Sequence, residues 1–145
     1  MSVVIVTGGF DPCHSGHVAY LYAAKALGDQ LWVGLNSDRW LTEKKGKPFM
    51  PWNERYAVLN AMKPVNFVFA FDDNDGSARD AIRQARKWTI NEKDKKIIFA
   101  NGGDRTSSNI PEMDVKDDNI EFVFGVGGED KKNSSSWILK KWNEE

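Results

Sequence analysis

The chain has 145 residues, of which 41% are hydrophobic and 28% charged, a composition typical of one globular domain that can bury its own core. Its formal net charge of -1 excludes a general electrostatic attraction to nucleic acid or to an anionic membrane surface. A single cysteine excludes an internal disulfide, and no apolar run has the length of a signal segment or a membrane span, so we predict a cytoplasmic protein with no nucleic acid or membrane partner.

Apolar runs in the first half of the chain predict strands that alternate with helices. The runs at residues 3–6, 31–35 and 65–71 have the length and composition of buried strands. Apolar residues recur at helical spacing over residues 16–27, with Ser15 as the expected N-cap. The order strand, helix, strand predicts a right-handed unit whose first two strands are parallel.

The middle of the chain is predicted to contain one long loop and two helices. Residues 39–51 combine two prolines and a glycine with several lysines, which predicts a mobile loop. A second helix is expected to begin near Asn53 and to end before Pro64. A third helix, which Ser77 can cap, is expected to extend to about Trp88.

The last third of the chain predicts two strands and a final helix. Residues 97–100 and 120–126 are the expected fourth and fifth strands, and a helix capped by residues 133–136 extends to Trp142. The alternation predicts an α/β fold, a Rossmann-like three-layer sandwich with a mainly parallel five-stranded sheet and a single domain over residues 1–145. Polar and glycine-rich residues follow the strands, so we expect a ligand site at the carboxyl edge of the sheet.

The segment of residues 7–17 carries the clearest chemical pattern, because two glycines precede both histidines of the chain. Glycines let a backbone approach phosphates, and two imidazoles at a helix start can donate hydrogen bonds to phosphate oxygens. A turn with two surface histidines would show the same pattern. A metal site of Cys13, His14 and His17 is a further alternative, although a fourth ligand is missing. We favour an anion site.

Residues 7–17 resemble the GxFDxxHxGH signature of the cytidylyltransferase-like nucleotidyltransferases, and further motifs extend this resemblance over nearly the whole chain. The resemblance implies transfer of a nucleotidyl group from a nucleoside triphosphate to a small phosphorylated sugar or polyol, with Mg²⁺ as cofactor and pyrophosphate as product. It implies that His14 and His17 are catalytic and stabilise the transferred phosphate. The residues implied to line the phosphate loop are Thr7, Gly8, Gly9 and Phe10.

Charged residues further along the chain match other positions of the family pattern. A lysine-rich run stands where the family carries a catalytic lysine on a flexible segment, with Lys44 as the first candidate and Lys47 as the second. A solvated charged face would explain either lysine equally well. Arg55 lies in a segment that resembles the family's PxxER element and is expected to bind a phosphate of the nucleotide. Asp11 and Asp38 are the expected substrate-binding carboxylates.

Two motifs near the end complete the resemblance. Gly103 and Asp104 belong to a glycine-glycine-Asp element found particularly in sugar-phosphate members, and they are expected to bind the nucleotide. Residues 133–139 resemble the closing motif, whose hydroxyls would hold the β and γ phosphates. These hydroxyls belong to Ser134, Ser135 and Ser136. The chain departs from the motif at Leu139, where the family has a basic residue, and Lys140 follows.

The sequence leaves the substrates open. The members it most resembles use CTP with glycerol 3-phosphate or ATP with heptose 1-phosphate, and the small single-domain form slightly favours CTP. An adenylyltransferase for pantetheine phosphate or a mononucleotide would share the histidine motif, and a nucleotide-binding sensor without turnover is the alternative outside enzymes. The resemblance also implies a homodimer. The acidic cluster at residues 72–75 fits either an acidic surface turn or a contact to sugar hydroxyls or a cation; we favour the turn for Asp75 and leave Asp72 open.

Overall fold

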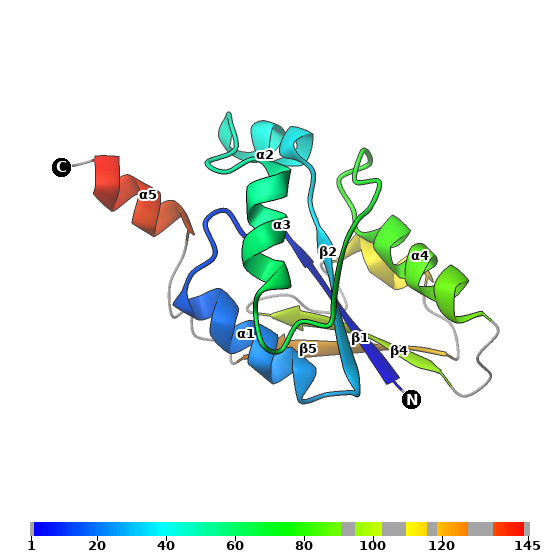
Figure 1. Cartoon of the computed structure of the whole chain (residues 1–145). Helices are drawn as coiled ribbons and strands as arrows, with labels where there is room; N and C mark the ends of the chain where they lie inside the picture. Colours follow the sequence, from blue (N-terminus) through cyan, green and yellow to red (C-terminus); the bar gives the residue numbers. More distant parts are fainter. Residues whose placement is uncertain (1, 91–94, 103–109, 116–118, 128–134, 144–145) are drawn as a thin grey trace.

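The computed structural model describes residues 2–90, 95–102, 110–115, 119–127 and 135–143 (Figure 1). Its strands are β1 (Ser2–Gly8), β2 (Gln30–Leu35), β3 (Phe67–Ala70), β4 (Lys96–Gly102) and β5 (Ile120–Val126). Its helices are α1 (Ser15–Lys25), α2 (Asp38–Lys45), α3 (Trp52–Asn60), α4 (Arg79–Thr89), the 3-10 helix η1 (Pro111–Val115) and α5 (Ser135–Asn143). No helix within the described ranges is long and apolar enough to cross a membrane.

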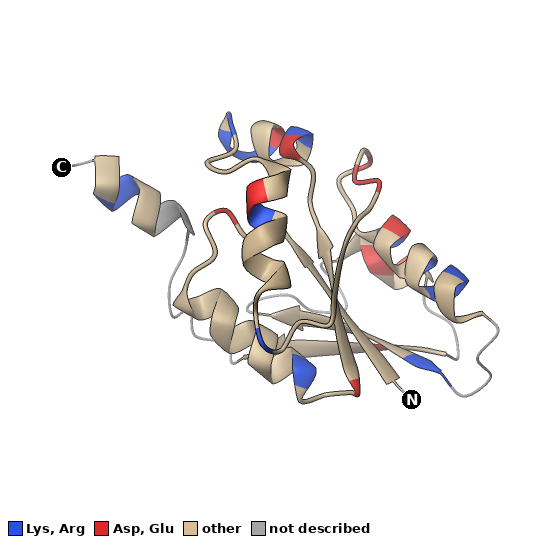
Figure 2. Cartoon of the chain, in the orientation of Figure 1, with Lys and Arg blue, Asp and Glu red and all other residues tan. Residues whose placement is uncertain are grey.

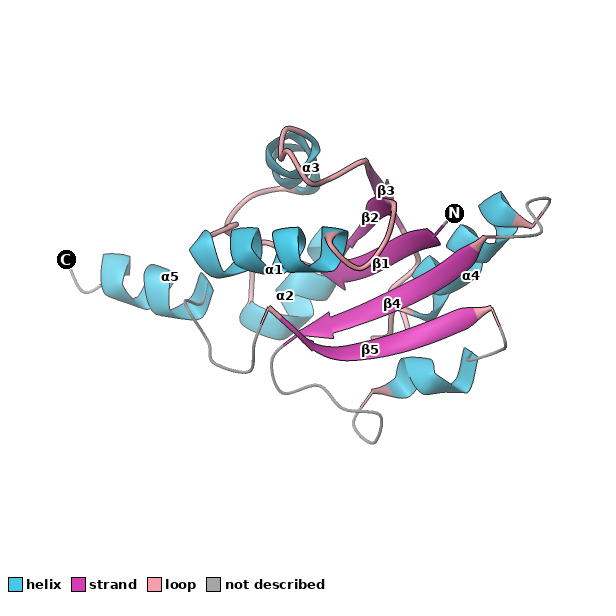
Figure 3. Cartoon of the chain, turned by 90° about the horizontal axis from the view of Figure 1, so that it is seen from below, coloured by secondary structure: helices cyan, strands magenta, loops and turns pink. Residues whose placement is uncertain are grey.

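The five strands form one sheet in the order β3-β2-β1-β4-β5, and every neighbouring pair is parallel. This arrangement confirms the predicted Rossmann-like α/β fold. The central strand β1 pairs with β2 from Val3 opposite Gln30 to Gly8 opposite Leu35. The chain adds β2 and β3 on one side of β1 and then crosses to β4 on the other side (Figure 3). Such a reversal of strand order creates a crevice at the carboxyl ends of the central strands.

Side chains of β1 contribute to a hydrophobic core on each face of the sheet. Val4 and Val6 pack in the core that contains Leu21 of α1 and Leu59 of α3. The other core contains alternate β1 residues and α4 residues, including Val3, Ile5, Ala81 and Ile82. Because successive strand side chains point to opposite faces, an uncharged β1 can be covered on both sides. The three layers hold the end of β1 rigidly in the middle of the sheet.

Helix α2 occupies much of the segment predicted to be a mobile loop, so that prediction is wrong for residues 39–45. The hydroxyl of Ser37 caps α2 by accepting a hydrogen bond from the amide of Trp40 (3.1 Å), and Leu41 is buried. Gly46 ends the helix with a φ of +93°, a backbone conformation that favours glycine. Both prolines follow this point and do not interrupt the helix. Basic residues cluster at the end of α2 and in the next turn (Figure 2).

Other predicted boundaries differ from the observed ones by a few residues. Pro51, rather than Asn53, is the N-cap of α3, and it makes no side-chain capping hydrogen bond. Helix α4 begins one residue beyond Ala78, and Ser77 stands just outside it. The predicted third strand is shortened to β3, whereas β5 has the predicted limits. These differences leave the order of the elements unchanged.

Candidate active site

The two histidines cap the start of α1 and fix each other's tautomer. His14 is the N-cap, and its Nδ1 accepts hydrogen bonds from the amides of Gly16 (3.1 Å) and His17 (3.4 Å). His17 Nδ1 accepts one from the amide of His14 (3.3 Å), which completes a capping box. The prediction of Ser15 as the N-cap is therefore wrong by one residue. A neutral imidazole whose Nδ1 accepts a hydrogen bond carries its proton on Nε2, so each neutral ring presents an Nε2–H donor.

The histidine rings lie together at the end of β1. Their centroids are 3.8 Å apart with an interplanar angle of 20°, and the edge of Phe10 meets His17 at 4.8 Å. Phe10 is buried and has a φ of +49°, a strained conformation for a residue other than glycine. This residue turns the chain from β1 toward α1. The arrangement places both rings at the amino end of a helix, where backbone dipoles attract anions.

His17 is neutral at physiological pH. Its burial, and then the electrostatic effects of His14 and Lys44, lower the pKa of His17 from 6.5 to about 3. A neutral ring can donate a hydrogen bond from Nε2 without first taking up a proton.

We expect His17 to remain neutral from about pH 8 to about pH 5, because its folded-state pKa of about 3 lies below that range. In the unfolded chain the same ring takes up a proton near pH 6.5. Between these two values the unfolded state binds more protons, so the contribution of His17 to the free energy of unfolding decreases as pH falls. Nitrogen-15 NMR of the imidazole and urea unfolding at several pH values measure both effects. Titration of folded His17 near pH 6.5 would contradict the assignment.

The glycines of the loop let α2 lie directly against it. A Cβ atom added to Gly9 would lie 2.7 Å from Leu41 Cδ2, and one added to Gly8 would lie 3.0 Å from the ring of Phe10. Thr7 lies at the end of β1, opposite Gly34 of β2. A larger residue at Gly9 would therefore displace α2 or Leu41. The phosphate contacts expected of Thr7, Gly8, Gly9 and Phe10 stay predictions.

Helix α2 brings one of its lysines to the histidines. The ammonium group of Lys44 lies 4.8 Å from the centroid of the Trp40 ring, one helical turn earlier, and its charge acts on His17. Lys45 instead forms an ion pair with Asp11, with Nζ 2.8 Å from Oδ2. Lys47 is exposed in the turn beyond α2. Through Leu41 and Lys45, α2 packs against the loop that leads to the histidines, and the catalytic role of Lys44 on this helix stays a prediction.

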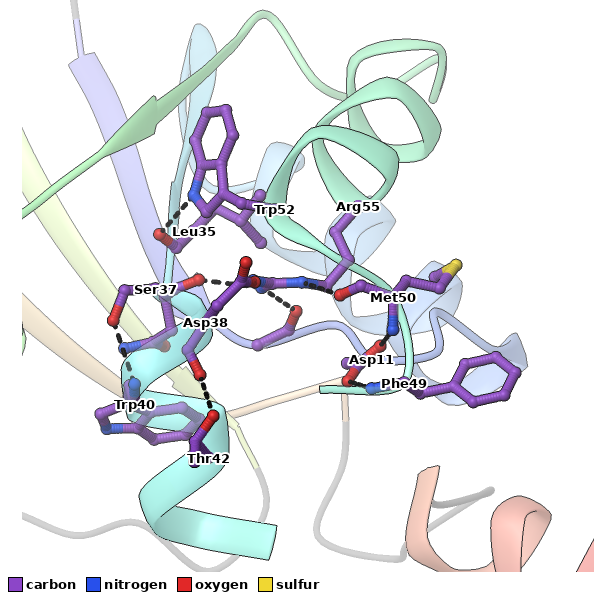
Figure 4. Close-up of polar contacts among 12 residues, drawn as sticks. Asp11, Leu35, Ser37, Asp38, Trp40, Thr42, Phe49, Met50, Trp52 and Arg55 are labelled. Atoms are coloured by element: carbon purple, nitrogen blue, oxygen red, sulfur yellow. Dashed lines mark hydrogen bonds and ion pairs between the residues drawn. The ribbon is translucent and has the colours of Figure 1, made fainter. Parts of the chain in front are cut away.

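Asp11, which follows Gly8 and Gly9 in the loop between β1 and α1, binds the segment after α2 (Figure 4). Its Oδ2 accepts a hydrogen bond from the amide of Phe49 (2.6 Å), and its Oδ1 accepts one from the amide of Met50 (2.7 Å). Its side chain is 1% exposed and also pairs with Lys45. Both carboxylate oxygens are therefore engaged within the protein, and binding of substrate by Asp11 stays a prediction.

Arg55 lies at the centre of the site's framework, with no exposed surface. Its NH1 donates to the carbonyls of Gly9 (2.9 Å) and Asn36 (2.8 Å), and its Nε donates to the carbonyl of Met50 (2.9 Å). Its NH2 donates to Asp38 Oδ1 at 2.7 Å (Figure 4). Arg55 therefore ties the ends of β1 and β2 to the start of α3. A phosphate could reach this guanidinium only if some of these bonds were broken.

Asp38 lines a cavity at the carboxyl ends of β2 and β3. The cavity has a volume of about 240 Å³ and is bounded by Leu35, Ser37, Asp38, Trp52, Ala70 and Phe71. The Asp38 side chain is 46% exposed, and its Oδ1 pairs with Arg55. The cavity therefore has one carboxylate among largely apolar neighbours, which is compatible with the substrate-binding role expected of Asp38.

Asp73 is a structural residue of the site whose role the sequence did not reveal. It is 5% exposed and accepts hydrogen bonds from the amide (2.8 Å) and hydroxyl (2.7 Å) of Ser37 and from Asn36 Nδ2 (3.0 Å). These bonds fix the end of β2 and the start of α2. The sequence feature that could have indicated this role is the position of Asp73 soon after a buried strand. Neighbouring Asp72 and Asp75 accept local hydrogen bonds from Asn74 and Ser77, as expected of an acidic turn.

Part of the expected nucleotide site falls outside the described residues, namely Gly103, Asp104 and Ser134. Ser135 and Ser136 are the first residues of α5. Both views place the start of α5 beside the start of α1, and the rest of α5 extends away from the sheet (Figures 1 and 3). The backbone arrangement thus brings two helix starts together, and phosphate binding by the three serines stays a prediction.

Comparisons with known proteins identify the family of the chain. The family model described as cytidylyltransferase-like matches residues 5–140. The bifunctional protein HldE of Geobacter metallireducens is 33% identical over 148 residues, which cover 99% of this chain and 28% of the relative. HldE of Campylobacter fetus is 44% identical over 75 residues, which cover 50% of this chain and 16% of the relative. The chain thus spans little more than a quarter of the Geobacter relative's length.

Solved structures share the fold. A lipopolysaccharide core biosynthesis protein from Thermoplasma volcanium superposes with a TM-score of 0.62 and 25% identity, covering 92% of this chain and 99% of that one. A putative nicotinate-nucleotide adenylyltransferase from Vibrio parahaemolyticus has a TM-score of 0.64 at 12% identity, covers 99% of this chain and 87% of that one, and supports the fold alone. With the family match over nearly its whole length, the chain belongs to the cytidylyltransferase-like family.

Proposed function

We propose that this enzyme transfers a nucleotidyl group from a nucleoside triphosphate to a small sugar phosphate and releases pyrophosphate. The observation that carries the proposal is the pair of capped histidines, whose neutral forms have Nε2–H donors at the start of α1. A phosphate of the acceptor is already an anionic nucleophile at neutral pH, so the reaction needs no general base. Catalysis then depends on positioning and on stabilising charge at the α-phosphorus.

In this proposal His14 and His17 donate hydrogen bonds to the α-phosphate oxygens, and Lys44 contributes a positive charge from α2. Mg²⁺ enters with the triphosphate as part of the substrate and neutralises its phosphate charge. Within the described residues, no group of three or more His, Cys, Asp or Glu side chains is placed to hold a metal ion. Mg²⁺ bound mainly by water and phosphate oxygens needs no such cluster.

The cavity beside Asp38 suits the carbon skeleton of the acceptor. Leu35, in its wall, is the sheet partner of Gly8, so this wall residue lies about one strand spacing, ~4.8 Å, from the end of β1. Within the described part of the chain, Asp38 Oδ2 accepts no hydrogen bond, which leaves it available to a sugar hydroxyl. A volume of about 240 Å³ favours a small acceptor over a long pantetheine arm or a second nucleotide.

For the nucleotide we propose ATP, although the sequence alone slightly favours CTP. The resemblance of Gly103 and Asp104 to sugar-phosphate members favours the heptose 1-phosphate branch, which uses ATP. The similar Thermoplasma protein is described as acting in lipopolysaccharide core biosynthesis, a name that also indicates sugar chemistry. Both observations bear on the acceptor, and they favour ATP only because the heptose 1-phosphate branch uses ATP.

Pyrophosphate release measures the reaction, the nucleotide and the acceptor together. ATP, CTP, GTP and UTP are each combined with heptose 1-phosphate, glycerol 3-phosphate, pantetheine phosphate and nicotinamide mononucleotide, with and without Mg²⁺. We expect the highest kcat/KM for ATP with heptose 1-phosphate, and no turnover without Mg²⁺. Preference for CTP with glycerol 3-phosphate would overturn the proposed substrates. Tight triphosphate binding in calorimetry without pyrophosphate from any pair would instead support the sensor alternative.

A further inference from the structure

Asp11 holds the turn after α2 from both sides. Before the turn, Lys45 Nζ donates to the backbone carbonyl of Asp11 (2.6 Å) and pairs with its Oδ2 (2.8 Å). After the turn, the amides of Phe49 (2.6 Å) and Met50 (2.7 Å) donate to the same carboxylate. Between these contacts the chain reverses at Gly46, which has a φ of +93°. The buried side chain of Asp11 thus fixes both ends of the turn at residues 46–48, which contains Lys47.

The positive charge of Lys45 neutralises the buried carboxylate of Asp11. The Asp11 side chain is 1% exposed and that of Lys45 is 24% exposed, so this ion pair is largely shielded from water. A buried carboxylate that loses its cation is strongly disfavoured. Asp11 also stands three residues before His14, where an unpaired negative charge would repel a phosphate.

Helix α2 is held at its two ends by different residues. Asp73 binds Ser37 and Asn36 at the start, and Arg55 binds Asp38 in the first turn. Lys45 is the last residue of α2, directly after Lys44. If the last turn of α2 moved while its first turn stayed fixed, the Lys44 ammonium would move relative to His17.

We propose that Lys45 is a positioning residue for nucleotidyl transfer: its ion pair with Asp11 fixes the last turn of α2 and so directs Lys44 toward the phosphate held by His14 and His17. This inference rests on the proposed function for its catalytic consequence. The attachment of the turn to the glycine loop can be tested without any turnover.

The kinetic test compares Lys45→Met with Lys45→Arg. We expect Lys45→Met to lower kcat about tenfold while the KM for the triphosphate changes less than about threefold, because a misplaced Lys44 weakens transition-state stabilisation. Arginine keeps the ion pair and should restore most of kcat. In a Lys44→Ala background, Lys45→Met should lower kcat by less than about twofold, since no lysine is left to misdirect. An undiminished tenfold loss in that background would overturn the positioning role and indicate that Lys45 contacts phosphate itself.

Hydrogen exchange provides a second readout that does not depend on activity. Lys45→Met should increase amide exchange at residues 46–50 and leave β1 unchanged, whereas Lys96→Met should alter neither exchange there nor turnover. Lys96 is the matched control because it forms an exposed ion pair with Glu121 at the amino end of β4. If Lys45→Met does not fold, the double variant Asp11→Asn/Lys45→Met removes the unpaired charge and should still show faster exchange. Unchanged exchange at 46–50 would overturn the proposal, while a wild-type enzyme without turnover would refute only the proposed function.

Discussion

Replacing His17 by alanine is expected to lower kcat by about 10²–10³-fold, the usual cost of removing one preorganised donor from a charged transition state. The neutral ring of His17 carries its proton on Nε2 because Nδ1 accepts the amide of His14, and alanine has no group to replace this donor. The KM for the triphosphate should change much less than kcat, because the lost hydrogen bond strengthens as the α-phosphorus reacts. Steady-state pyrophosphate release measures both constants.

The control for this prediction is Tyr22→Ala, which removes a half-exposed aromatic ring from the same helix and should leave kcat unchanged. His14→Asn separates capping from catalysis, because asparagine is a good N-cap residue but lacks the Nε2–H donor. We expect this variant to melt near the wild-type temperature and to lose turnover. Wild-type kcat in His17→Ala would remove His17 from the mechanism, whatever the melting temperature.

Arg55→Met is expected to lower the free energy of unfolding by about 3–5 kcal/mol, since each buried polar group left without a partner costs about 1–3 kcal/mol. The substitution leaves the carbonyls of Gly9, Asn36 and Met50 without their donors. Asp38 loses its cation as well, but this carboxylate is 46% exposed and can be solvated. Urea unfolding monitored by circular dichroism measures the change.

The matched control is Arg83→Met on the exposed face of α4, where we expect a change within about 0.5 kcal/mol. Arg55→Lys keeps the charge but cannot span four acceptors, so it should remain less stable than the wild type. If Arg55 bound the nucleotide instead, Arg55→Lys would raise the KM for the triphosphate at unchanged stability. That result would contradict the framework role and support the phosphate contact implied by the family resemblance.

Much of the fold could be predicted from the sequence because each apolar run is bounded by residues that end regular structure. The parallel order and the position of the ligand edge follow from alternating strands and helices. The largest error was α2, where lysines, a glycine and prolines indicated a loop. Over residues 39–45, however, the cap by Ser37 and the burial of Leu41 stabilise a helix. Such tertiary contacts outweigh local propensity.

For the candidate site as well, the sequence predicts the types of residue, and the structure adds the contacts that they make. The histidine motif indicated an anion site, and the structure adds that each ring caps α1 through Nδ1. The sequence predicts Lys44 as the first candidate and Lys47 as the second, and it gives no sign of the ion pair between Lys45 and Asp11, because only the packing of α2 determines which lysine meets Asp11. It also predicts that Asp11 and Arg55 bind ligands; the structure adds that their polar atoms engage backbone groups within the protein, and ligand binding by both residues stays a prediction.

The sequence by itself determined the fold class, the family and the placement of histidines and glycines at the end of the central strand, because these depend on patterns between near neighbours in the chain. Only the tertiary structure decided which charged side chains hold the framework and which face the crevice. Arg55 meets the carbonyls of Gly9 and Asn36, 46 and 19 residues away in sequence. Asp11 meets the amide of Phe49, 38 residues away, and Asp73 meets Asn36, 37 residues away. A buried charge takes whichever distant partner the packing brings within hydrogen-bonding distance, and no local pattern encodes that choice.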